Sequence, residues 1–347
     1  MTAPASPHIE VRPDWLARRE ETILEPDLPI IDPHHHLWDR PGNRYVLADL
    51  MNDLDAGHNV RATVFVQCRT MYRTEGPEAL RPVGEVEFVR GIAAQAANGS
   101  CGGRLPCAAI VAFADLTLAD DVAPVLEALA EAGGGRLRGI RNQTAWHEDP
   151  AISSNPVPPK PGLLLHEGFQ AATRRLARHG LSLDVWAYHT QLPEVRALAR
   201  ASPDTLIVLD HLGGPLGVGR YAGRREEVFA AWKRDLASLA ALPNLRLKLG
   251  GLAMKVGGFD FHERALPPSS TELAEAWRPY VETGIELFGP SRAMFESNFP
   301  VDKGMVSYPV LWNTFKRLAS GFSATERWDL FHDTAARTYG LSALGAS

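Results

Sequence analysis

The sequence predicts an α/β fold and, within that class, a closed (β/α)8 barrel made by a single domain. Short runs rich in leucine and β-branched residues alternate with segments of helical hydrophobic period, which is typical of a parallel sheet. The chain has 347 residues, which is enough for eight such units, since a barrel of this kind needs about 250. No G-x-G-x-x-G follows the first run, which argues against an open dinucleotide-binding sheet.

Eight segments have the length and composition of buried strands. In chain order they are 29–32, 62–67, 107–113, 137–141, 181–186, 206–210, 245–249 and 293–296. Segments with helical period lie between or after them, at 85–97, 169–178, 193–200, 226–241, 271–288 and 308–319. In 226–241, for example, Val228, Trp232 and Leu236 fall on one face. Ser270 and Ser323 are expected to cap helices, and 325–341 is expected to form one or two helices that complete the outer ring.

The expected organisation is an N-terminal arm over 1–27, the barrel over 28–341 and a tail over 342–347. Prolines interrupt the arm, which has room for a short helix at 14–21. Two long connections, 142–165 and 250–270, are rich in proline and glycine and follow strands. In a barrel both would lie on the catalytic face, where long loops shape or cover a pocket.

Composition excludes several classes of partner. The net charge is -5 with no long basic run, so nothing favours nucleic acid or an anionic membrane. Three cysteines at irregular spacing are too few for a disulfide framework or a cysteine-rich zinc site. The N-terminus has no apolar signal region, and no stretch reaches the length of a membrane span. We therefore expect a cytoplasmic protein with a small-molecule substrate. A homo-oligomer is compatible with the sequence, which leaves the oligomeric state open.

The first predicted strand leads directly into three histidines. Side chains alternate along an extended chain, so His34 and His36 share a face and His35 points the other way. Two imidazoles on one face can hold one metal ion or polarise one carbonyl. A histidine-rich surface turn is the alternative, and the apolar strand before the cluster argues against it.

Other strand ends supply further candidates, because polar residues at the carboxyl ends of barrel strands are where catalysis occurs in this fold. These candidates are Gln67 and Arg69 after strand 2, Arg141 after strand 4, His189 after strand 5, His211 after strand 6, Lys248 in strand 7, and Glu296 and Asn298 after strand 8. Glu296 lies two residues before Asn298, so both face the same side.

The chain resembles the amidohydrolase superfamily, specifically the amidohydrolase-related branch that holds sugar-acid lactonases, the pyrone-dicarboxylate lactonase and related decarboxylases. The residues that carry the resemblance are Asp32-x-His34-x-His36-x-Trp38-Asp39, Asp210-His211-x-Gly213 and Ser297-Asn298-Phe299-Pro300, with Gly139-Ile140-Arg141 and Gln191-Leu192-Pro193 as weaker matches. The resemblance spans roughly residues 28 to 341. It implies a distorted (β/α)8 barrel with a hydrolytic site at its mouth.

In metal-using members, two strand-1 histidines, a strand-5 histidine and a strand-8 aspartate surround a divalent ion. The resemblance places His34, His36 and His189 at the first three positions, and His211 at a histidine that carries protons or contacts substrate. Asn298 stands where the aspartate is expected, and an amide cannot accept the proton of a water. Two alternatives follow. Three neutral histidines hold Zn²⁺ with water as the fourth ligand, or no metal is bound and Glu296 or His211 is the base.

We expect a hydrolase that opens a lactone, or another cyclic ester or amide, of a small carboxylated or sugar-acid substrate. His211, Asn298 and Glu296 are the expected catalytic residues. Arg141 and Lys248, with Gln67 and Arg69, are expected to bind substrate and its carboxylate. Arg141 and Lys248 could instead be paired charges inside the barrel, and His189 could be structural. The alternative functions are a non-oxidative decarboxylase or hydratase acting on an aromatic or muconate-like acid, and a ligand-binding relative without catalysis.

Overall fold

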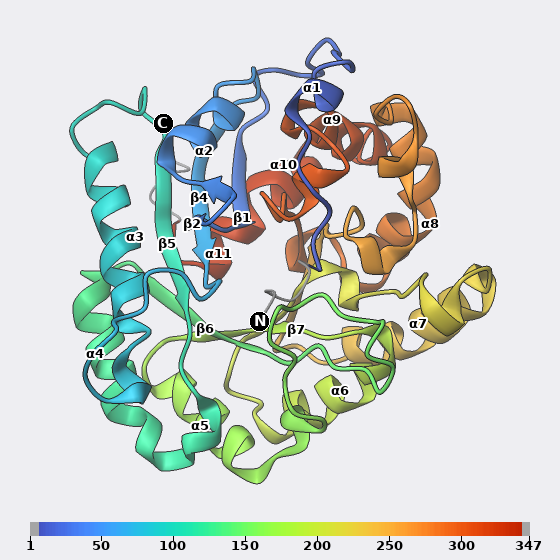
Figure 1. The fold of residues 1–347 in the computed structure, drawn as a ribbon. Coiled ribbons are helices and arrows are strands. Elements are labelled where there is room, and N and C mark those ends of the chain that lie inside the picture. Colours follow the sequence, from blue (N-terminus) through green and yellow to red (C-terminus); the bar gives the residue numbers. More distant parts are fainter. Residues whose placement is uncertain (1–6, 342–347) are drawn as a thin grey trace.

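The computed structural model describes residues 7–341, and eight parallel strands within it form the predicted barrel (Figure 1). The strands, in their order around the sheet, are β1 (Ile30–His35), β4 (Val60–Val66), β5 (Leu105–Ala112), β6 (Leu137–Gln143), β7 (Ser182–Trp186), β8 (Ile207–Leu209), β9 (Leu245–Leu249) and β10 (Ala293–Phe295). Each corresponds to one predicted run, so the fold prediction is confirmed. The expected tail, 342–347, lies outside the described residues.

The two edge strands of the sheet, β1 and β10, are joined by the chain that follows β10. The Asn298 N–H donates to the His34 carbonyl oxygen over 2.9 Å, and the His36 N–H donates to the Phe299 carbonyl oxygen over 2.7 Å. His35 and Phe299 form a parallel bridge between these hydrogen bonds. The backbone that completes the barrel therefore carries residues predicted for the site from both ends of the fold.

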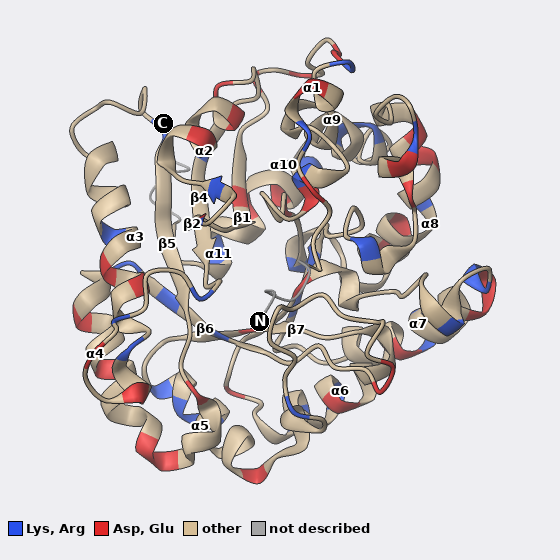
Figure 2. Ribbon diagram, viewed as in Figure 1, with Lys and Arg blue, Asp and Glu red and all other residues tan. Residues whose placement is uncertain are grey.

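Helices surround the strands as an outer ring (Figure 1). They are α3 (Val83–Ala96), α4 (Ala123–Gly133), α5 (Glu167–Arg178), α6 (Leu192–Ala201), α7 (Arg225–Ala240), α8 (Ser270–Phe288) and α9 (Tyr308–Leu318), followed by the short α10 (Ala324–Trp328) and α11 (Thr334–Thr338). Acidic and basic residues lie side by side on the outer helices (Figure 2). Within residues 7–341, none of the helices combines the length and the apolar character needed to cross a bilayer.

Several local features differ from the sequence prediction. Helix α4 was not predicted, although proline in the first turn (Pro124) and glycine after the last turn are typical of helix ends; Gly134 ends it in the left-handed conformation. Helix α2 (Leu47–Leu54) and the hairpin of β2 (Trp38–Arg40) with β3 (Asn43–Tyr45) were also not predicted. Ser269, rather than Ser270, caps α8 by accepting from the Glu272 N–H, whereas Ser323 caps α10 as predicted.

The N-terminal arm is hydrogen-bonded to the loop before α8 and to α9. Its short helix α1 (Pro13–Leu16) is shorter than the predicted 14–21. Around this helix, arm side chains donate to carbonyl oxygens of the loop before α8, from Arg12 to His262, Trp15 to Arg264, Arg18 to Ala265 and Arg19 to Pro267. The Leu24 N–H donates to Asn313 on α9. The arm is therefore positioned by bonds to two separate elements of the barrel.

Alternation along the strands separates an inner from an outer layer. On β10, Met294 lies in an inner cluster with Ile31, Val64 and Val208, whereas Phe295 belongs to the outer core between strands and helices. Glu296, the next residue, is fully buried. The apolar pattern of this strand thus leads directly to a buried carboxylate at its carboxyl end.

Replacing Phe295 by alanine should lower the free energy of unfolding by about 3–5 kcal/mol. The Phe295 ring packs 4.7 Å from that of Phe315 and 4.8 Å from that of Phe331, measured between centroids, so the change leaves a cavity between β10 and the helices. Urea unfolding measures the loss. Leu165→Ala, at a side chain that is 48% exposed, is the control and should change stability by no more than about 0.5 kcal/mol. Equal effects of the two substitutions would contradict this packing.

Candidate active site

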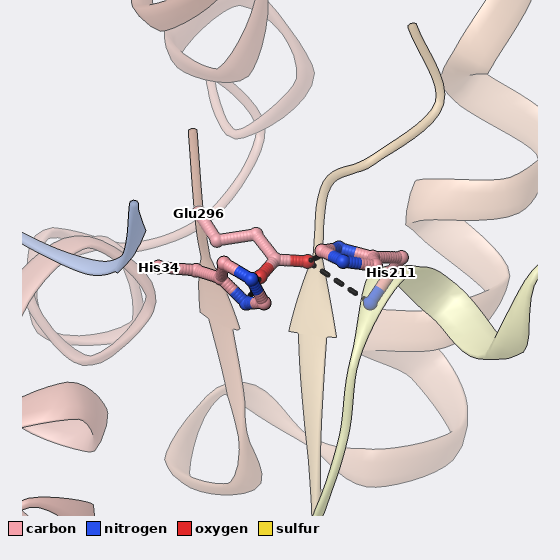
Figure 3. A group of neighbouring side chains, drawn as sticks. All are labelled: His34, His211 and Glu296. Carbon is pink, nitrogen blue, oxygen red and sulfur yellow. Dashed lines mark hydrogen bonds and ion pairs between the residues drawn. The ribbon is translucent and has the colours of Figure 1, made fainter. Parts of the chain in front are cut away.

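Glu296 lies between two histidines that come from different strands (Figure 3). Its Oε1 accepts from the His211 ring at Nδ1 over 2.7 Å and from the His211 backbone N–H over 2.9 Å. Its Oε2 lies 2.8 Å from His34 Nδ1. All three side chains are buried, and their nitrogen and oxygen atoms lie within 4.8 Å of one another. Strand ends far apart in the sequence thus meet at one carboxylate.

The protonation of this group follows from its surroundings. Burial opposes ionisation of Glu296, but interactions with His211 and His34 outweigh burial and lower the pKa of the carboxyl to about 2. Burial and the nearby Lys248 charge lower the pKa of His34, so that ring is neutral near pH 7. An ionised carboxylate only accepts, so His211 Nδ1 carries a proton, and in the neutral ring Nε2 is an acceptor. His211 lines a cleft at the barrel mouth.

Two cations lie directly beside His34. Lys248 Nζ lies 2.7 Å from Asp184, 3.0 Å from Asp210 and 3.1 Å from His34 Nδ1. Arg141 Nη1 lies 3.3 Å from Asp210 and 3.2 Å from His34 Nε2. Burial opposes the charge on Lys248, but the surrounding carboxylates raise its pKa. These buried charges are paired, as such charges must be in a protein interior.

The donor set of this group suits a divalent metal ion. Two neutral imidazoles and one carboxylate are a ligand combination that zinc takes. Glu296 Oε2 faces His34 Nδ1 over 2.8 Å, and a carboxylate oxygen has more than one lone pair, which leaves a lone pair available for an ion. His34, His211 and Glu296 therefore fit such an ion, and Lys248 and Arg141 would compete with it for the His34 ring.

The three histidines predicted as metal ligands lie in different places. His36 lies beside His34, with ring centroids 5.0 Å apart, and its Nδ1 bonds the Val66 carbonyl oxygen over 2.7 Å. His189 is on the turn after β7, where its Nδ1 accepts from the Leu216 N–H over 3.3 Å and its ring packs on Tyr221. Within residues 7–341, His189 belongs to no group of three metal-type donors. The structure thus places His36 next to His34, but of the three predicted ligands only His34 belongs to the three-donor group.

Asn298 lines the cleft, with a carboxyl group directly behind it. Its backbone is in the left-handed region at φ 54°, and its Nδ2 donates to Asp302 Oδ1 over 2.8 Å. Asp302 Oδ2 accepts from the Ala253 N–H over 3.3 Å. Burial raises the pKa of Asp302 to about 7. Asp302 was not among the predicted catalytic residues, although its position four residues after Asn298 is a signal that could have identified it.

A cleft opens at the barrel mouth, and its empty space of about 450 Å³ includes the part that is open to solvent. Four predicted residues line it, namely His36, Arg141, His211 and Asn298, together with residues that were not predicted, including His8, Trp38, Arg40, Gln143 and Trp186. No carboxylate is among the lining side chains. The cleft therefore presents two guanidinium groups and no acidic group, a charge pattern that suits an anion.

The other predicted substrate-binding residues do not line this cleft. Gln67 is buried, and within residues 7–341 both polar atoms of its side-chain amide have no partner. Its carbonyl oxygen accepts from Arg141 over 2.6 Å. Lys248 is fully buried among carboxylates. Arg69 is exposed, in the left-handed backbone region. A direct contact with substrate is thus not supported at these three positions.

Comparison with known proteins finds a matching family model and several similar proteins. The family model described as amidohydrolase matches residues 31–341. An uncharacterized protein of Sinorhizobium fredii is 32% identical over 338 residues, covering 90% of this chain and 99% of that protein. A Burkholderia multivorans protein named L-fucono-1,5-lactonase is 31% identical over 323 residues, covering 90% and 96%. The crystal structure of a Burkholderia multivorans amidohydrolase with bound zinc is 27% identical, with a TM-score of 0.69 and coverage of 90% and 99%.

Asp302 should make folding stability depend on pH. Its pKa is raised from 3.8 to about 7 in the folded chain, so the folded state binds more protons than the unfolded state between these values. The stability from this group is fully present below pH 3.8 and is lost as the pH rises to 7. The free energy of unfolding should therefore fall as the pH rises from 3.8 to 7. In Asp302→Asn, which cannot titrate, this fall should be smaller by roughly 2–4 kcal/mol.

Urea titrations at several pH values between 4 and 7.5 measure this slope. Asp39→Asn, at an exposed carboxyl of the β2 strand, is the matched control and should leave the slope as in the unmodified protein. If Asp302→Asn and Asp39→Asn give the same pH dependence, Asp302 does not titrate as described.

Proposed function

This chain belongs to the amidohydrolase family and is a hydrolase, and from that membership we propose that it opens the lactone ring of a small carboxylated or sugar-acid substrate by attack of water. The observation that carries the proposal is His211, which contacts the buried Glu296 carboxylate through Nδ1 and lines the cleft beside Arg141. A base oriented by a carboxylate, next to a cation, suits hydrolysis of an ester carbonyl.

The chemistry follows from these positions. His211 Nε2 accepts a proton from water while the water oxygen bonds to the lactone carbonyl carbon. Arg141, which lines the cleft and whose Nε–H has no partner among the described residues, stabilises the negative charge that develops on the carbonyl oxygen. The ring C–O bond then breaks, and His211 returns its proton to the departing oxygen. The product is an open hydroxy acid.

Glu296 is a positioning residue in this scheme rather than the base. Its pKa of about 2 makes it a weak proton acceptor near pH 7, and its oxygens are already directed at His211 and His34. It fixes the His211 tautomer and stabilises the imidazolium that forms during attack. Of the two bases expected from the sequence, we therefore propose His211.

A divalent ion, with zinc as the candidate, would be held by His34, His211 and Glu296, and His211 would then be a ligand instead of the base. When bound, such an ion would polarise a carbonyl or acidify water. Support comes from the donor set of this chain and from the zinc-bound relative. The name of the lactonase relative supports a sugar-lactone substrate, and the cationic cleft supports an acidic one.

His211→Asn should lower kcat/KM for lactone hydrolysis by about 10²–10⁴-fold, because it removes the proton acceptor. Glu296→Gln should lower kcat and change the pH dependence of the rate, because the histidine loses its carboxylate. A pH-stat assay with a panel of sugar-acid and carboxylated lactones measures both effects. His179→Asn, at an exposed histidine after α5, is the control and should retain full activity. Full activity of His211→Asn would exclude this mechanism.

Metal analysis of protein purified without chelator should detect about one divalent ion per chain. Glu296→Gln and His34→Asn should each lose that ion, and His189→Asn should retain it, because His189 lies outside the three-donor group. Circular dichroism confirms that each variant is folded. Loss of metal from His189→Asn together with retention in Glu296→Gln would contradict the proposed ligands.

A further inference from the structure

Arg40 is a second guanidinium in the cleft, and it comes from the hairpin directly after His36. Its Nη2 donates to the Cys68 carbonyl oxygen over 2.6 Å, and its guanidinium carbon lies 4.6 Å from the centroid of the Trp38 ring. The side chain is half-buried and lines the cleft. One hydrogen bond and one aromatic face thus hold the group in place while it remains accessible.

Arg40 and Arg141 differ in whether a carboxylate lies beside the guanidinium group. Arg141 lies 3.3 Å from the Asp210 carboxylate, which compensates its charge. Within the described part of the chain, Arg40 forms no ion pair with a carboxylate, and no carboxylate lines the cleft. An accessible guanidinium without a counter-charge, at the wall of a cavity, favours an anionic group from outside the protein.

Among the described residues, the Trp38 ring beside Arg40 lies close to two histidine rings. The His8 ring lies parallel to Trp38, with centroids 6.2 Å apart at 10°, and the His36 ring lies 6.0 Å away at 20°. Burial and the nearby Arg40 charge lower the pKa of His8 to about 4, so His8 is neutral near pH 7. Recognition of an anion on this side of the cleft therefore depends on Arg40, while the rings provide flat walls for a ring-shaped molecule.

We propose that Arg40 binds a carboxylate carried by the substrate and thereby makes the enzyme selective for acidic lactones. This inference rests on the proposed lactone hydrolysis. The substrate ring lies along Trp38, with its carboxylate at Arg40 and its reacting carbonyl between Arg141 and His211. Arg40 takes the role that the sequence suggested for Arg141 and Lys248, with Arg69. Arg141 is paired with Asp210, Lys248 is buried among carboxylates and Arg69 is exposed.

The test compares an acidic lactone with the methyl ester of the same molecule, which lacks the charge. Arg40→Gln should raise KM for the acidic lactone about 10–100-fold, as expected for loss of a charge-assisted hydrogen bond, with kcat changed less than about threefold. The ester should show little change in KM. Arg40→Lys, which keeps the charge but not the planar fork, should give an intermediate KM. Arg44→Gln, at an exposed arginine of the same hairpin, is the matched control.

The outcomes separate this inference from the proposed function. Failure of the unmodified protein to open any lactone would overturn the proposed function itself. Turnover of the acidic lactone with an unchanged KM in Arg40→Gln would overturn the role of Arg40 alone. An equal loss with the acid and the ester would also overturn it, because that result indicates a general disturbance of the Trp38 wall rather than recognition of charge.

Discussion

The barrel can function only if its first and last strands are held together, and the hydrogen bonds between β1 and the chain after β10 do this. They place His34, near the start of the fold, beside Glu296, near its end. Cross-barrel contacts of this kind are costly in chain entropy until the sheet closes. Closure of the barrel therefore brings polar residues from distant parts of the sequence into one group.

Closure also buries an unusual amount of charge. Asp184, Asp210 and Glu296 meet Lys248 and Arg141 around the neutral His34. Such a network contributes little net stability compared with apolar packing, but removing one member leaves an uncompensated buried charge. The network instead fixes the positions of the charges around His34 and Glu296. Charges that are already in place need no rearrangement when charge develops on a substrate.

Loops and the arm supply the walls that the strands lack. The β2–β3 hairpin contributes Trp38 and Arg40, the proline-rich loop contributes Asn155, and the arm brings His8. The strands thus position the candidate catalytic residues, whereas connections outside the sheet form much of the cleft wall. This division is common among barrels, because loops vary without disturbing the core.

The sequence by itself determined the barrel and identified several residues of the candidate site. Strand alternation is local, so the eight runs and the polar residues at their ends, such as His34, His211 and Asn298, could be identified without contacts. Even so, helix α4 was not identified, although proline at its start and glycine at its end are typical of helix boundaries. Only the tertiary structure decided that Lys248 is enclosed by carboxylates, that Arg69 is exposed and that Arg40 and His8 reach the cleft. The physical reason is that a strand pattern fixes a residue's position along the sheet, whereas side-chain direction beyond the strand, and the charges it meets, depend on packing between distant segments.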